Sequence, residues 1–139
     1  MKVYRDEPVI ERLYEQGRRL AEGVNTAIAA YGLEKNVRLV GRPCCLAYAT
    51  LDENGQPSQA LRTLLLQETI RRGVLMPSLV VSYTHSDTDI ARTVDAIDGA
   101  LGVYVRALND GVDNYLTGRP SEVVYRRFND APSYPPAKR

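Results

Sequence analysis

The chain has 139 residues, of which 44% are hydrophobic and 25% charged, and its formal net charge is +1. This length and composition fit one folded domain and exclude an intrinsically disordered chain. A net charge so close to zero gives no electrostatic affinity for nucleic acid or for an anionic membrane. No apolar run approaches the length of a spanning helix, and the charged start "MKVYRDEPVI" is unlike a signal peptide. We therefore expect a soluble, cytoplasmic domain.

The first segment, residues 6–31, predicts a long amphipathic helix. Pro8 suits its first turn and Gly32 its end. Gly17 and Gly23 each cost a helix about 1 kcal/mol relative to alanine, which indicates close packing against an unidentified partner. One apolar stripe runs along the segment at steps of three, four or seven: Val9, Leu13, Leu20, Val24, Ala27, Ile28 and Tyr31.

Two strands are predicted next, in "NVRLVGRP" (36–43) and "CCLAYATL" (44–51). The adjacent Cys44 and Cys45 rarely form a disulfide with each other, because neighbouring side chains point opposite ways along a strand. They also lack a second pair for zinc, so we expect small buried hydrophobic residues. The following "DENGQP" contains Asn54-Gly55, a turn signal.

Residues 57–72 predict a second long helix, which begins near Pro57 and ends at Gly73. A short strand, "LVVSY", is predicted at 79–83. The apolar patch expected on the helix is Leu61, Leu65, Leu66 and Ile70.

Ser86 begins the strongest helix signal, with a capping box in which Asp89 replaces the usual Glu or Gln. We expect a further short helix over 109–117. The domain itself is predicted to span residues 1–118, and the proline- and arginine-rich residues 119–139 to form an extended tail. The apolar positions of the capped helix alternate at steps of four and three: Ile90, Val94, Ile97, Leu101, Tyr104 and Leu108.

The order of these elements predicts an α+β fold, in which a small sheet of three to four mainly antiparallel strands is covered by helices on one face. No repeat or low-complexity tract interrupts it.

The reactive residue types do not form a catalytic constellation. His85, the one histidine, has no nucleophile or metal partner nearby in sequence, and we interpret it as a framework residue that ends a strand beside a capped helix. Asp87 and Asp89 occupy the first helical turn, where capping explains them better than metal binding. No phosphate-binding glycine loop or nucleophile elbow occurs. We therefore predict no catalytic, cofactor-binding or metal-binding residue.

Three segments taken together resemble a known family: "RLYEQGRRLAEGVNTAI" (12–28), "LRTLLLQETIRRGVL" (61–75) and "YTHSDTDIARTVDAIDGAL" (83–101). They resemble the C-terminal small domain of class III aminotransferases, and within that family glutamate-1-semialdehyde 2,1-aminomutase and its relatives. With Ser82 before it, the third segment resembles the family pattern S-x-A-H-T-x-x-D-I-x-x-T-x-x-A, with Thr84 and Ser86 in place of the Ala and Thr that flank the histidine. The resemblance covers roughly residues 9–108.

This resemblance implies a pyridoxal 5'-phosphate (PLP) enzyme of fold type I, a homodimer that transfers amino groups. In that family the Schiff-base lysine lies in a large domain that precedes the small one. We therefore expect Met1 to be an internal residue of a longer enzyme, and the large domain of that enzyme to be the partner of this chain. Lys2, Lys35 and Lys138 lie in segments expected to be exposed, so this chain alone is expected to be inactive and not to hold PLP covalently.

The chain departs from the family after its "RGV" turn. Where many aminomutases have "APSQFEA", only Met76-Pro77-Ser78 stands before Leu79, so neither the glutamate of that loop nor the carboxylate-binding arginine of other transaminases has a counterpart. In the family this loop lies toward the active-site entrance. The resemblance thus makes Met76, Pro77 and Ser78 candidates for lining a substrate channel.

Two other interpretations stay open. The chain is also compatible with an independent α+β module that binds a ligand or partner without catalysis, or with a regulatory domain that senses a small metabolite. If the family resemblance is correct, an apolar surface normally covered by the large domain is exposed here and favours self-association.

Overall fold

The computed structural model describes residues 2–122. Most of the predicted tail, residues 123–139, lies outside the described residues. In chain order the elements are α1 (Lys2–Asp6), α2 (Val9–Ala30), β1 (Val37–Arg42), β2 (Cys45–Thr50), α3 (Gln59–Arg71), α4 (Asp87–Asp110) and the short 3-10 helix η1 (Val112–Asn114).

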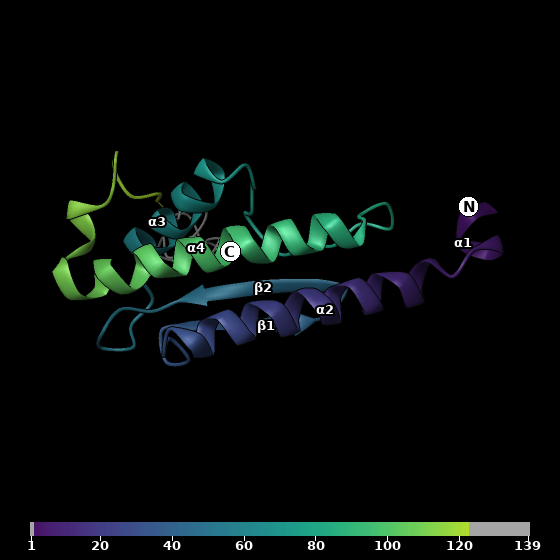
Figure 1. Ribbon diagram of the computed structural model, residues 1–139, viewed down its shortest axis with the longest axis horizontal. Helices are drawn as coiled ribbons and strands as arrows, with labels where there is room; N and C mark the ends of the chain where they lie inside the picture. Colours follow the sequence, from purple (N-terminus) through teal and green to yellow (C-terminus); the bar gives the residue numbers. More distant parts are fainter. Residues whose placement is uncertain (1, 123–139) are drawn as a thin grey trace, which may run out of the picture.

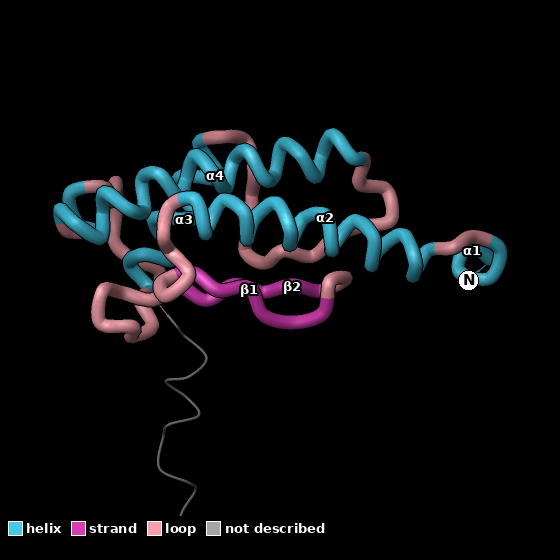
Figure 2. Tube along the Cα trace, turned by 60° about the horizontal axis from the view of Figure 1, so that its bottom comes forward, coloured by secondary structure: helices cyan, strands magenta, loops and turns pink. Residues whose placement is uncertain are grey.

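The sheet of the described chain is an antiparallel hairpin of β1 and β2, whose register runs from Val37 opposite Thr50 to Arg42 opposite Cys45. Alternate residues of β2 face the core, and the residues between them face outward. Figure 2 shows the hairpin along one side of the molecule, with α2, α3 and α4 all on the same side of the hairpin. The predicted α+β class, with an antiparallel sheet covered by helices on one face, is confirmed.

The core lies between the hairpin and the three long helices. Figures 1 and 2 show α2 and α4 side by side along the length of the molecule, with α3 against α4. Tyr104 of α4 is fully buried, and its hydroxyl donates a hydrogen bond of 2.9 Å to the carbonyl of Leu51, directly after β2. The other side chains at the centre of the core are Val24, Leu64, Leu65 and Leu101.

The long helix predicted over residues 6–31 begins later than expected: α2 starts at Val9, directly after Pro8, and Asp6 ends the separate short helix α1. Pro8 adopts φ −78° and ψ 59° between α1 and α2. A proline has no backbone N–H to donate and disfavours helical geometry at the residue before it, which here is Glu7. The helix therefore restarts at Val9, which is buried.

The strand predicted at residues 79–83 is absent. Only Leu79 pairs with the sheet, through its N–H to the carbonyl of Leu46 at 3.0 Å. Val80 is 52% exposed, and a turn closed by the N–H of His85 on the carbonyl of Ser82 follows. The sheet accordingly has fewer strands than the three or four expected.

Two helical predictions shift in detail. On α3 the face toward the core includes Leu64, which is fully buried, whereas Ile70 is 53% exposed. The helix predicted over 109–117 is mostly wrong: α4 continues to Asp110, Gly111 ends it at φ +92°, and only η1 follows. None of the helices in the described part of the chain has the length and apolar character needed to cross a membrane.

The cysteines also differ from expectation. Cys44 is half-buried in the hairpin turn, Cys45 is exposed on β2, and both are free thiols. The outward face of β2 has no element of the described chain above it (Figure 2), so a small apolar residue there stays accessible.

Candidate functional site

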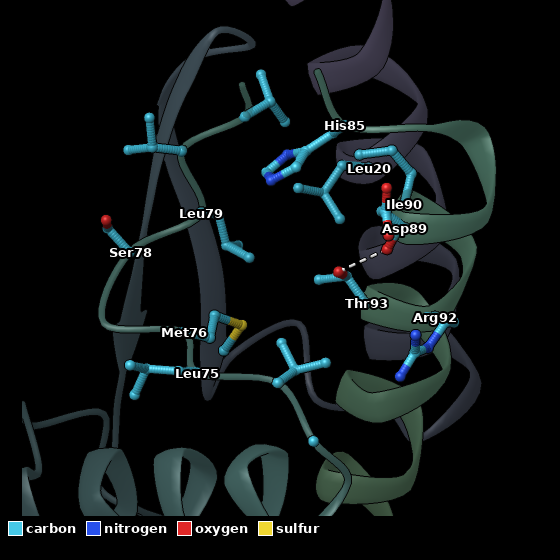
Figure 3. Close-up of a pocket in the computed structure, with 14 residues that line it drawn as sticks. Leu20, Leu75, Met76, Ser78, Leu79, His85, Asp89, Ile90, Arg92 and Thr93 are labelled. Carbon is cyan, nitrogen blue, oxygen red and sulfur yellow. Dashed lines mark hydrogen bonds between the residues drawn. The ribbon is translucent and has the colours of Figure 1, made fainter. Parts of the chain in front are cut away.

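A pocket of about 290 Å³ opens between the segment that follows α3 and the first half of α4. Leu20 of α2 closes its inner end (Figure 3). The pocket is apolar within and polar at its rim. Its lining residues are Leu20, Gly73, Val74, Leu75, Met76, Ser78, Leu79, Val80, Val81, His85, Asp89, Ile90, Arg92 and Thr93.

The ring of His85 points into the pocket near Leu20 (Figure 3). Its Nδ1 accepts a hydrogen bond of 3.1 Å from the backbone N–H of Ser82. A nitrogen that accepts carries no proton, so the neutral ring holds its proton on Nε2. The backbone of His85 is fixed as well, because the side-chain amide of the fully buried Gln16 donates to its carbonyl. The site thus presents one oriented N–H donor.

The start of α4 is capped as predicted. The hydroxyl of Ser86 accepts from the N–H of Asp89 at 3.2 Å, and the carboxylate of Asp89 accepts from the N–H of Ser86 at 2.8 Å. This backbone hydrogen bond, together with one of 2.7 Å from the Ser86 hydroxyl, lowers the pKa of Asp89. The rim of the pocket therefore carries a carboxylate at neutral pH.

The first turn of α4 is also anchored to α2. Asp87 accepts ion-pair contacts from Arg19 at 2.9 Å and from Arg12 at 3.4 Å. All three side chains are at least a third exposed, so the pairs contribute little stability. The packing of α2 against α4 sets the relative position of the two helices, and hence of Leu20 and the first turn of α4.

Of the three channel candidates, Met76 and Ser78 line the pocket and Pro77 does not. Met76 is buried and points toward α4, while the Ser78 side chain points to the outer side of the segment (Figure 3). The carbonyl of Met76 accepts from the Tyr48 hydroxyl at 2.9 Å, and that of Pro77 accepts from Arg62 at 2.8 Å. That Met76, Pro77 and Ser78 line a substrate channel stays a prediction.

Arg62 links the 76–78 segment, which forms one wall of the pocket, to the sheet. Its guanidinium lies 4.5 Å from the centre of the Tyr48 ring and donates to the Tyr48 carbonyl at 3.3 Å. Burial raises the pKa of the Tyr48 hydroxyl, which stays protonated and keeps donating to Met76. The wall is therefore positioned by β2 and α3 together.

The sequence did not identify three of the rim residues as part of a site. Arg92 and Thr93 stand three and four residues after Asp89, so both lie next to Asp89 on one side of α4. That polar spacing was visible beside the apolar stripe. Their proximity to His85 and to Leu79 depends on the tertiary fold, which no local pattern encodes.

PLP that is held covalently requires an amine that forms a Schiff base with its aldehyde. No lysine lines this pocket. Lys35 is exposed in the loop between α2 and β1, in a different hollow shared with Arg38 and Asp52. Lys138 lies outside the described residues. The pocket does not fit PLP held covalently. Within residues 2–122, no group of three or more His, Cys, Asp or Glu side chains is placed to hold a metal ion.

No family model matches this sequence, and no curated protein matches it. Among solved structures, the chain is similar to the FumI protein of Sphingopyxis sp. MTA144, solved in its PLP internal aldimine form. The TM-score is 0.68 at 20% sequence identity, and the match covers 78% of this chain and 26% of that chain. The chain thus spans about a quarter of the length of that protein, with which it shares its fold.

Proposed function

We propose that this chain is the small C-terminal domain of a PLP-dependent aminotransferase or aminomutase, resembling the glutamate-1-semialdehyde 2,1-aminomutase group. The observation that carries the proposal is the match over 78% of the chain to just 26% of a PLP-containing protein. A small lobe of a larger enzyme would produce this asymmetry. The three ordered segments of the sequence support the same assignment independently.

The chemistry of the pocket is consistent with an enzyme in which another domain anchors the cofactor and this chain helps to shape the substrate site. When bound, PLP supplies an electron sink for reactions at the carbon that carries the amine. The described part of this chain offers the pocket no amine to anchor it. Its contribution would be to shape and orient: the 76–78 segment, held by Tyr48 and Arg62, would form a wall of the substrate channel.

The surface supports a covering partner. Leu75 is 77% exposed and Val80 is 52% exposed, both at the pocket rim, and Val40 is 52% exposed on the outward face of β1. Exposed aliphatic side chains close to an apolar pocket are typical of a surface that another domain covers. We propose the large PLP-binding domain as that partner, within a cytoplasmic homodimer.

The second candidate is a ligand-binding α+β module that acts without catalysis. The pocket itself favours it, because an apolar interior with a few oriented polar groups is what a small-molecule site requires.

The test begins with the DNA upstream of Met1. An uninterrupted reading frame that encodes a large domain is expected, and its full-length product is purified with PLP, reduced with borohydride and mapped by mass spectrometry. The label is expected on one lysine outside residues 1–139. Stoichiometric labelling of Lys35, or a stop codon immediately before Met1, would contradict the proposal and leave the ligand-binding module.

A further inference from the structure

The two edges of the hairpin differ in how their backbone groups are satisfied. The outer edge of β2 is covered, because its outward carbonyls accept hydrogen bonds of 3.0 to 3.3 Å: Leu46 from Leu79, Tyr48 from Arg62 and Thr50 from Ser58. The outer edge of β1 is open. We propose that this edge binds an extended acidic segment of another protein, which pairs with β1 as a further antiparallel strand. The inference does not depend on the proposed function.

The open groups of β1 follow from the register. In an antiparallel ladder the N–H and C=O of one residue point to the same side, and the side alternates along the strand. Leu46 directs its carbonyl away from β1, and its partner in the register is Gly41. Two and four residues before Gly41, the N–H and C=O of Leu39 and the C=O of Val37 accordingly point away from β2. The Val37 N–H donates to the carbonyl of Leu33 at 2.8 Å, but the other three groups have no hydrogen-bond partner within residues 2–122.

The regular edge of β1 ends at Val40, because Gly41 adopts φ +106°, outside the extended region. An added strand therefore pairs opposite residues 37–40. It would exchange two backbone hydrogen bonds with Leu39 and donate one to the carbonyl of Val37. So short a ladder leaves the choice of partner to the side chains.

The side chains along this edge are basic. Arg38 and Arg42 are exposed on the outward face of β1, on either side of the exposed Val40. Neither arginine forms an ion pair within residues 2–122, although Arg38 shares a hollow with Asp52. Residues directly opposite on neighbouring strands have Cβ atoms about 5 Å apart, and opposite charges there are favourable. A carboxylate opposite Arg38 therefore suits this edge.

Two other occupants fit less well. Antiparallel pairing of two β1 edges keeps both outward faces on the same side, so a second copy would bring Arg38 and Arg42 of both chains together. Charged residues on an edge strand commonly prevent such pairing. The large domain is proposed to cover the pocket rim, and Leu79 of that rim pairs with β2 on the opposite side of the sheet from the open edge.

The probe is the peptide acetyl-Glu-Thr-Val-Thr-Glu-Val-amide, titrated into the full chain labelled with nitrogen-15 and followed by NMR. In the proposed register its fourth residue lies opposite Leu39 and its fifth opposite Arg38. The peptide is expected to shift the amide signals of residues 37–41 and to slow hydrogen exchange of the Leu39 N–H. No shift in this segment would overturn the site.

N-methylated peptides test the backbone pairing. A methyl group on the fourth nitrogen removes the donor to the Leu39 carbonyl and is expected to weaken binding about fivefold. The matched control carries the methyl group on the fifth nitrogen, whose N–H points away from β1, and is expected to bind like the parent peptide. Equal losses for the two peptides would overturn strand pairing.

A charge exchange tests the side chains. Arg38→Glu is expected to weaken binding of the peptide about threefold to fivefold, and to bind better a peptide with lysine in the fifth position. Arg92→Glu, at an exposed arginine of α4 outside the hairpin, makes the same change of net charge and should leave the preference for glutamate unchanged. Thermal unfolding shows whether each variant is folded. A preference that does not invert in Arg38→Glu would overturn the acidic partner.

The same experiments identify the two other occupants. Shifts at residues 37–41 that grow with chain concentration in the absence of peptide would assign the edge to a second copy. A full-length enzyme that no longer binds the peptide, compared with a 139-residue chain that does, would assign the edge to the large domain. Either result would overturn a separate protein as the partner, whereas peptide binding by both forms supports it.

Discussion

Gly17 of α2 lies directly against the main chain of Pro43 in the hairpin turn: a Cβ atom at Gly17 would stand 1.8 Å from the Pro43 carbonyl oxygen. This contact identifies the partner that the sequence left open. It also explains why a residue of low helix propensity occupies the middle of a long helix, because only glycine lets the two backbones approach so closely.

Gly17→Ala is therefore expected to destabilise the fold by about 2 kcal/mol or more, since the obstacle is backbone and cannot rotate away. The matched control is Gly102→Ala in α4, where the nearest atom to the new methyl group is the Tyr31 hydroxyl oxygen at 3.2 Å. The Tyr31 ring can shift, so the gain in helix propensity makes this variant neutral or slightly stabilising. Urea unfolding of both variants measures the difference, and equal effects would refute the role of Pro43.

A second prediction concerns acid stability. Glu68 of α3 is 4% exposed and accepts hydrogen bonds from Arg71 at 2.7 Å and from Arg72 at 2.8 Å. Burial alone would raise the pKa of Glu68, but the hydrogen bonds from Arg72 and Gln67 and the nearby charges lower it below 4.5. The unfolded chain thus takes up a proton first, so this contribution is complete above pH 4.5 and is lost as the pH falls through the folded-state pKa.

Glu68→Gln is expected to lower the free energy of unfolding by about 1–3 kcal/mol at neutral pH, because the charge-assisted hydrogen bonds are weakened. The difference from the parent chain should shrink below pH 4.5. Glu34→Gln, at an exposed carboxyl in the loop after α2, is the control and should show no such difference. Urea unfolding across an acid pH series measures it, and a constant difference at every pH would be the contrary result.

A third prediction concerns alkaline stability. Burial strongly raises the pKa of Tyr104 from its ordinary value of 10.0. The unfolded chain ionises first as the pH rises, so the contribution of Tyr104 is complete below pH 10.0 and is lost at higher pH. Tyr104→Phe removes this part of the pH dependence and, by deleting the hydrogen bond to Leu51, costs about 1–2 kcal/mol near neutrality. Tyr4→Phe, at an exposed ring, should change neither quantity.

The fourth prediction concerns the exposed aliphatic residues at the pocket rim. The double variant Leu75→Ser, Val80→Ser is expected to reduce self-association in sedimentation experiments, because it removes apolar area that water contacts in the isolated chain. Its free energy of unfolding should change by about 0.5 kcal/mol or less for each substitution. Ile10→Ser replaces an aliphatic residue on α2 that is 59% exposed, and serves as control. Association that persists undiminished in the double variant would show that this rim is not the surface responsible.

Local signals predicted the three long helices α2, α3 and α4 and the hairpin, but not α1 or the way the chain ends after α4. The capping box at Ser86 is a short-range hydrogen-bond pattern, and the alternation across 36–51 reports a half-buried sheet. The prediction at 79–83 was wrong because an apolar run forms a strand only where it finds a partner, and only Leu79 reaches Leu46.

The burial of Glu68 and the exposure of Ile70 also depend on tertiary contacts that a local pattern does not show. A periodic pattern locates an apolar face but does not show that Arg71 and Arg72 will neutralise a carboxylate at its margin. The pocket was out of reach for a related reason: residues 73–81 and Asp89, Arg92 and Thr93 meet only after α4 has packed on α2 and α3. The sequence pointed to Met76, Pro77 and Ser78 as residues of a substrate channel, which stays a prediction; of the three, Met76 and Ser78 line the pocket, and the sequence did not show what they would face.

The wall formed by residues 76–79 is attached to the rest of the domain through main-chain atoms: the carbonyls of Met76 and Pro77 and the N–H of Leu79. Every amino acid has a carbonyl group, and all except proline have an N–H. Exposed positions such as Pro77 and Ser78 can consequently change identity during evolution without loss of these attachments. Homologous proteins could therefore diverge in what they recognise here while inheriting the same framework.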